Sequence, residues 1–128
     1  MLTLRWKIEE GQSLPIVESI EYANTFWKRF WGWMGKRQVS DEQGIILAPC
    51  NAIHTFGMRF AIDVIFLDQN QKVLMFIMNV PPGRMLRCPH AHFVVELVGG
   101  TLDRLPFSIS KGNQLIWLKN DDEPSTFI

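Results

Sequence analysis

The stretch Pro49–Asp68, PCNAIHTFGMRFAIDVIFLD, decides how the rest of the chain is interpreted, because it sets polar groups among apolar residues. It holds one cysteine, one histidine and two aspartates. Three interpretations are open: a Cys-His-Asp active site, half of a metal site, or a strand that carries polar residues into a core. We expect a strand, a loop corner and a second strand here, with Asp63 at the junction of a polar face and the apolar run VIFL.

Short strand-like segments lie on both sides of this stretch. LTLRWKI alternates apolar and charged side chains as a half-buried strand does. VIFL and KVLMFIMNV, separated by the polar DQNQ, predict a hairpin. LPIVESIEY, IILA, HFVVELV and LIWLK are further strand-sized runs. The pattern is typical of a mostly-β (α+β) domain, built as a small β-barrel or a sandwich of short strands.

One segment has helical character. Asn24 is a good N-cap, and Gly35 can end a helix in the left-handed conformation. Between them the large apolar side chains fall on one broad stripe: Phe26, Trp27, Phe30, Trp31 and Met34. The sequence therefore predicts one amphipathic helix packed on the β domain. The stripe is expected to face the core and not a lipid surface.

The length and charge of the chain limit the number of domains and the classes of partner to be expected. The 128 residues predict one β-rich domain over 1–120, followed by an acidic, flexible tail over 121–128. Lys+Arg and Asp+Glu both number 13, so no global field attracts nucleic acid or an anionic membrane, while self-association as a homodimer stays open. The N-terminal residues lack the apolar run of a signal peptide, and no stretch approaches a membrane span. We expect a cytoplasmic protein.

Several of these stretches resemble a known family. FWKRFWGWMGK, GIILAPCNAIHTFGMRFAIDVIFLD, VVELVGG and KGNQL are similar to the domain-of-unknown-function 192 family of bacteria and archaea, in the branch that carries IHTFGM. The likeness covers Ala23–Leu115. It implies a compact β-rich domain and no assigned enzymatic activity. Ala61 departs from the pattern, which usually has proline there, and Asn113 stands in place of the usual aspartate.

The cysteines and histidines allow two chemical hypotheses. Cys50 and His54 would lie about 13 Å apart on a strand, so a nucleophile-base pair needs the chain to fold back between them. Alternatively, the chain could bring Cys50 and His54 together with Cys88, His90 and His92 of CPHAH around a metal. Their spacing matches no common zinc signature. We therefore expect neither a resident metal nor a cofactor.

Two carboxylates lie inside apolar strand-like runs, Asp63 in AIDVIFL and Glu96 in VVELVGG. A buried carboxylate is costly unless it is paired or hydrogen-bonded, and either Arg59 or backbone donors could hold Asp63. The same groups could instead form the polar floor of a pocket.

The interpretation we favour is a non-catalytic binding module for a small ligand or a partner protein, with binding residues His54, Arg59, Asp63 and Glu96. No nucleic acid and no membrane are expected as partners. The alternatives are a hydrolase-type enzyme, using Cys50 or the Asp63/Glu96 pair with His54, and a transition-metal-binding protein.

Overall fold

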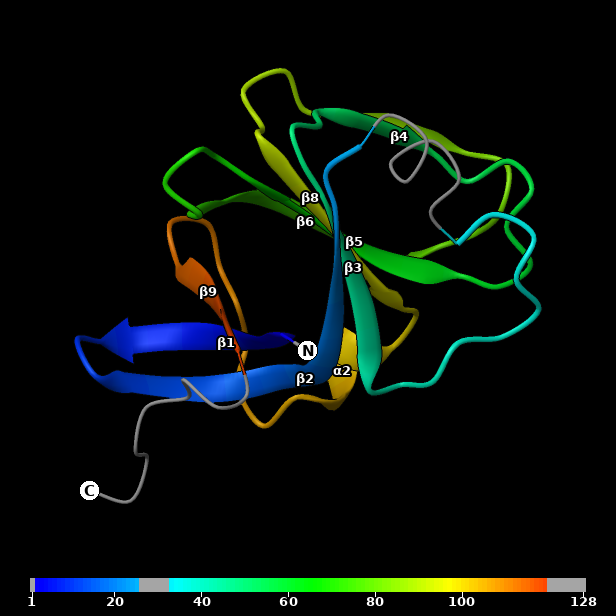
Figure 1. The fold of residues 1–128 in the computed structure, drawn as a ribbon. Helices are drawn as coiled ribbons and strands as arrows, with labels where there is room; N and C mark the ends of the chain where they lie inside the picture. The colour runs from blue at the N-terminus through cyan, green and yellow to red at the C-terminus, as the bar shows by residue number, and fades with distance from the viewer. Residues whose placement is uncertain (1, 26–32, 120–128) are drawn as a thin grey trace.

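The computed structural model describes residues 2–25 and 33–119 (Figure 1). Most of the predicted amphipathic helix, residues 26–32, and the whole predicted tail, residues 121–128, lie outside the described residues. The described elements are β1 (Leu2–Glu9), β2 (Gln12–Ala23), β3 (Gln43–Leu47), β4 (Ala52–His54), β5 (Ile62–Leu67), β6 (Val73–Val80), β7 (Met85–Arg87), β8 (Phe93–Val98), α2 (Thr101–Arg104) and β9 (Gln114–Lys119).

Seven strands form one mixed sheet in the order β6-β5-β8-β3-β2-β1-β9. Neighbours run antiparallel except β2 and β3, which are parallel. The two end strands approach each other at one isolated bridge, Lys72–Gln114. In the described part of the chain the sheet therefore curls towards closure without becoming a closed barrel. The mostly-β prediction is confirmed at this level.

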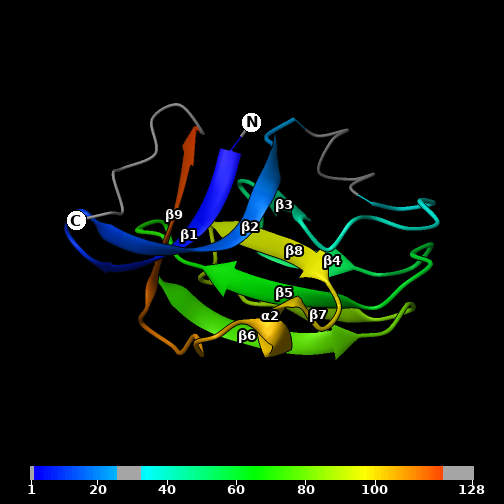
Figure 2. The same cartoon turned by 90° about the horizontal axis from the view of Figure 1, so that it is seen from below.

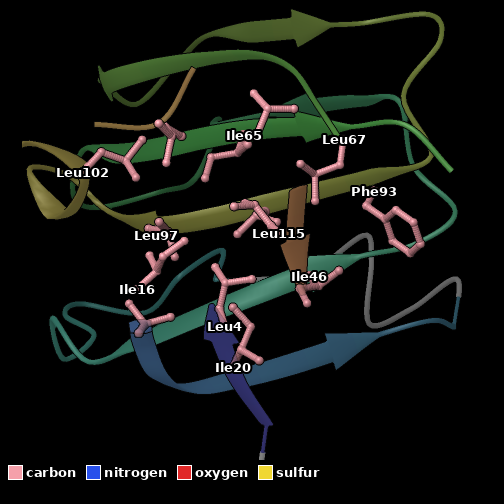
Figure 3. Close-up of a cluster of buried hydrophobic side chains, with 14 of the residues drawn as sticks. Leu4, Ile16, Ile20, Ile46, Ile65, Leu67, Phe93, Leu97, Leu102 and Leu115 are labelled. Carbon is pink, nitrogen blue, oxygen red and sulfur yellow. The ribbon is translucent and has the colours of Figure 1, made fainter. Parts of the chain in front are cut away.

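One face of the curled sheet holds the larger apolar cluster (Figure 3). Leu4, Ile65, Leu97 and Leu115 are fully buried there, although they come from strands far apart in the sequence. Each such side chain contributes about 1.5–3 kcal/mol by leaving water. The face holds side chains from all seven strands, so this cluster joins the two ends of the sheet.

The opposite face carries a second apolar cluster, which explains why β5 is buried at all six positions. Val64 and Phe66 belong to this second cluster, whereas Ile65 and Leu67 belong to the first. Ile53 of β4 and Leu86 of β7 pack over the second cluster. A strand covered on both sides shows a continuous apolar run in place of alternation, and VIFL is such a run.

The hairpin predicted from VIFL and KVLMFIMNV is confirmed, since β5 pairs antiparallel with β6. The strand-loop-strand expectation for the opening stretch also holds: β4 ends at His54 and β5 begins at Ile62. β4 pairs with β7 as a separate two-strand sheet. Both views place β4 away from the β1–β2 hairpin turn (Figures 1 and 2).

The short helix α2 was not predicted from the sequence. It follows β8 directly through Gly99 and Gly100, and Gly100 has a φ of 91° that other residues rarely adopt. Within the described residues, no helix has the length and apolar character needed to cross a bilayer.

Candidate functional site

Asp63 is a fully buried carboxylate held by backbone donors. Its Oδ1 accepts hydrogen bonds from the N–H of Asn79 at 2.9 Å and of Gly100 at 3.2 Å. Its Oδ2 accepts one from the N–H of Leu102 at 2.9 Å. Arg59 is exposed, and no ion pair joins it to Asp63 among the described residues. Of the two supports proposed for Asp63, the backbone donors are the ones observed.

Asp63 and Glu96 lie on opposite faces of the sheet. In the β5–β8 ladder Asp63 is opposite Leu97, and Val64 is opposite Glu96. Paired residues share a face, and consecutive residues alternate between faces. An acid/base pair formed by these two carboxyls is therefore incompatible with the register.

Glu96 is buried on the face of the second cluster. Its cross-strand neighbours there are Ile45 and Val64, both apolar, and only 5% of the residue is exposed. Burial raises the pKa of its carboxyl to about 7. The protonated form is favoured because an apolar setting penalises the charge. Glu96 is thus a titratable group inside the core and away from the solvent-facing side chains.

His54 belongs to a different surface, which we call the β4–β7 outer face: Ala52 and His54 of β4, Met85 and Arg87 of β7, and Phe56 beyond β4. The register places His54 opposite Met85 and Ala52 opposite Arg87. The Phe56 ring stacks on His54 with centroids 5.7 Å apart. Met85 is 75% exposed and Phe56 50% exposed. These two apolar side chains face solvent on a strand pair whose inner side is anchored in the core.

Thr55, between His54 and Phe56, fixes this surface and was not identified from the sequence. It is fully buried, and its hydroxyl donates to the carbonyl of Pro81 at 2.8 Å and accepts from the N–H of Arg84 at 2.7 Å. Its own N–H donates to the carbonyl of Arg84 at 2.8 Å. One threonine therefore joins the end of β4 to the PPGR loop before β7. The sequence feature that could have identified Thr55 is its hydroxyl group inside the largely apolar stretch IHTFGM.

Gly57 sets the turn of the same loop. Its φ is +82°, and an added Cβ would lie 2.8 Å from Cγ of Met34. Its carbonyl accepts a hydrogen bond from the N–H of Gly35 at 3.0 Å. The loop that carries Phe56 is therefore attached both to the PPGR loop and to residues 33–35.

The five cysteine and histidine residues do not form a metal centre. All five are among the described residues, and in that part of the chain no group of three or more His, Cys, Asp or Glu side chains could hold an ion. The Cys50 thiol donates to the carbonyl of Ala52 at 3.2 Å. His90 and His92 instead line a polar hollow of about 350 Å³ beside Asp68.

The curled mixed sheet and the strand pair that covers one of its faces define a small, mostly-β domain. The chain belongs to the domain-of-unknown-function 192 family (DUF192, "Uncharacterized ACR"), whose model matches residues 6–117. The resemblance drawn from the motif stretches is thereby confirmed.

Two curated relatives and two solved structures are similar to the chain. A UPF0127 protein of Thermococcus sibiricus is 33% identical over 102 residues, which cover 77% of this chain and 65% of that protein. A UPF0127 protein of Pyrococcus furiosus is 29% identical over 115 residues, covering 86% and 94% of the two chains.

The likeness to two crystal structures concerns the fold alone, because both sequence identities are low. A protein of unknown function from Novosphingobium aromaticivorans has a TM-score of 0.74 at 21% identity, over 90% of this chain and 84% of that one. A Sinorhizobium meliloti protein, for which a role as a transcription regulator has been suggested, has a TM-score of 0.76 at 19% identity, over 91% and 94%.

Proposed function

We propose that this protein is a non-catalytic binding module, and that it binds its partner through the β4–β7 outer face. The observation that carries the proposal is the exposure of Met85 and Phe56 beside His54 on a strand pair. Keeping large apolar side chains in water is unfavourable, and grouped ones mark interaction sites. Of the four binding residues expected from the sequence, His54 is part of this surface, and we keep Arg59 as a candidate because it is exposed three residues after Phe56.

The other two expected residues receive supporting roles. The Asp63 carboxylate already accepts three backbone hydrogen bonds, so few of its lone pairs are left for a ligand. Glu96 lies on the other face of the sheet from Asp63, among apolar neighbours. This separation favours recognition over general acid-base chemistry, which needs its groups within reach of one substrate.

The hydrogen bonds under the surface support binding as well. Thr55 and Gly57 hold the loop of Phe56 against two neighbouring segments. A surface that is ordered before binding loses less conformational entropy when a partner arrives. Met85, with its flexible thioether, can still adapt to the shape of that partner.

Native mass spectrometry of the protein purified from its own host tests the proposal. The wild type is compared with Met85→Glu and with Met75→Glu, a control at an exposed methionine on the edge strand β6. We expect a co-purifying molecule on the wild type and on the control, and its loss from Met85→Glu. Retention of the same molecule by a correctly folded Met85→Glu variant would contradict the proposed surface.

A further inference from the structure

We propose that the occupant of the β4–β7 outer face is an acidic segment of another protein that carries an apolar anchor residue. This inference rests on the binding function proposed above and names the chemistry of the partner. Three observations carry it: the distribution of charge along the chain, the position of the arginines, and the kind of side chains that are exposed.

Charge is segregated although the chain as a whole is neutral. Residues 48–62 and 81–95, which include β4, β7 and their loops, contain Arg59, Arg84 and Arg87 and no aspartate or glutamate. Because the totals are 13 and 13, the rest of the chain has three more acidic than basic residues. A cationic patch on a neutral protein attracts an anionic partner locally and repels cationic ones.

The register places one arginine, Arg87, on the same face as Met85, and a second, Arg84, precedes Met85 in the chain. Arg87 lies two residues after Met85 on β7, so both point to the same side of the strand pair. Arg84 directly precedes Met85, and its backbone is fixed by Thr55. All three arginines are exposed, and none forms an ion pair with another described residue. Their guanidinium groups are therefore available for carboxylates, which they can bind in bidentate fashion.

The exposed side chains favour a protein over a nucleic acid. Protein interfaces are enriched in aromatic residues, methionine and arginine and are poor in lysine, and this face carries Phe56, Met85 and Arg87. Single-stranded nucleic acid is held by successive aromatic platforms along a basic groove. Here one exposed ring, Phe56, is already stacked on His54.

The extent of the face matches a short segment. β4 and β7 have three residues each, which corresponds to about 10 Å of strand. A contact of this size lies well below the area of a stable domain-domain interface. An extended peptide with one apolar side chain on Met85 and Phe56, and carboxylates on Arg84 and Arg87, fits these dimensions.

Selection from a displayed library of random dodecapeptides tests the partner's chemistry. We expect the peptides enriched on the wild type to carry excess aspartate and glutamate around an aliphatic or aromatic residue. Their affinity, measured by fluorescence anisotropy, should fall about tenfold for the Arg84→Ala/Arg87→Ala double variant. It should be unchanged for Lys111→Ala, a control at an exposed cation outside β4, β7 and their loops. Replacing the peptide carboxylates by amides should weaken binding comparably.

The other outcomes overturn the inference and separate it from the proposed function. Enriched peptides without excess acid that still require Met85 would reject the acidic partner and leave the binding face intact. Failure to enrich any peptide, or binding of oligothymidylate that is lost in the double variant, would also reject it. If partners bind with an affinity that neither Met85→Glu nor the Arg84→Ala/Arg87→Ala double variant changes, the proposed function is rejected instead.

Discussion

The backbone N–H of Leu102 donates a hydrogen bond to Oδ2 of Asp63 at 2.9 Å, across 39 residues of sequence. The other carboxylate oxygen accepts from Asn79, near the end of β6, and from Gly100, which precedes α2. One side chain of β5 therefore fixes the end of its hairpin partner and the segment after β8. We expect Asp63 to act as a support residue of the scaffold, and the proposed binding surface is the separate β4–β7 outer face.

Replacing Asp63 by asparagine is expected to destabilise the fold by about 3 kcal/mol. The amide keeps the shape of the carboxylate but turns one acceptor oxygen into a donor. That donor would oppose a backbone N–H of Asn79 or Leu102 in a buried setting. Urea denaturation of the purified variant measures the loss.

Asp103→Asn provides the control, because Asp103 is an exposed aspartate on α2. Its free energy of unfolding should stay within about 0.5 kcal/mol of the wild type. A stability of Asp63→Asn equal to that of this control would show that Asp63 is not a support residue.

Thr55→Val should destabilise the protein by about 2 kcal/mol while keeping the side-chain volume. The substitution leaves the N–H of Arg84 and the carbonyl of Pro81 without their hydroxyl partner. Hydrogen exchange at the Arg84 amide should accelerate more than exchange in β5. Thr55→Ser, which retains the hydroxyl, should keep most of the protection; equal acceleration in both variants would argue against the hydroxyl as the cause.

Gly57 and Gly83 form a matched pair for the loop geometry. Both have positive φ, +82° and +86°, but a Cβ on Gly83 meets nothing within 4 Å, whereas one on Gly57 meets Met34. Gly83→Ala should cost about 1 kcal/mol from backbone strain alone. Gly57→Ala should cost more, because Met34 must also move. Equal midpoints in thermal melts would mean that Met34 yields without cost.

Sequence patterns were sufficient for the strands of the seven-stranded sheet and for the hairpin, whereas β7 was not predicted. VIFL and KVLMFIMNV are apolar runs on either side of a polar turn, and this local pattern is enough to predict a hairpin. The parallel pairing of β2 with β3 and the separate β4–β7 sheet depend on contacts between distant segments, which no local pattern encodes. Helix α2 is too short to show a helical period.

Sequence patterns say less about how the candidate site residues are arranged, for a geometric reason. His54 and Arg59 were identified as polar residues in an apolar stretch, and so were Asp63 and Glu96, but residue type alone does not give the face of a strand. A single-residue difference in register decides it: Glu96 is opposite Val64 and not opposite Asp63. Met85 and Phe56 were missed as surface residues because apolar side chains are normally assigned to a core.

Glu96 gives the stability a distinctive pH dependence. Burial raises the pKa of its carboxyl from 4.5 to about 7, so between these values the folded state binds a proton that the unfolded state has released. The free energy of unfolding must then fall as pH rises from about 4.5 to 7, and level off above 7. The total change is about 3 kcal/mol, at about 1.4 kcal/mol for each pKa unit.

Glu96→Gln removes this dependence, because the amide stays neutral at every pH. Urea denaturation between pH 5 and pH 8 should show a wild-type stability that declines with pH relative to the variant. The variant should have the higher free energy of unfolding near pH 8, because the wild type must then bury a charge between Ile45 and Val64. Glu21→Gln, at an exposed glutamate of β2, should follow the wild type throughout. Parallel stability curves for the wild type and Glu96→Gln would mean that Glu96 titrates in the folded state as an ordinary exposed glutamate does.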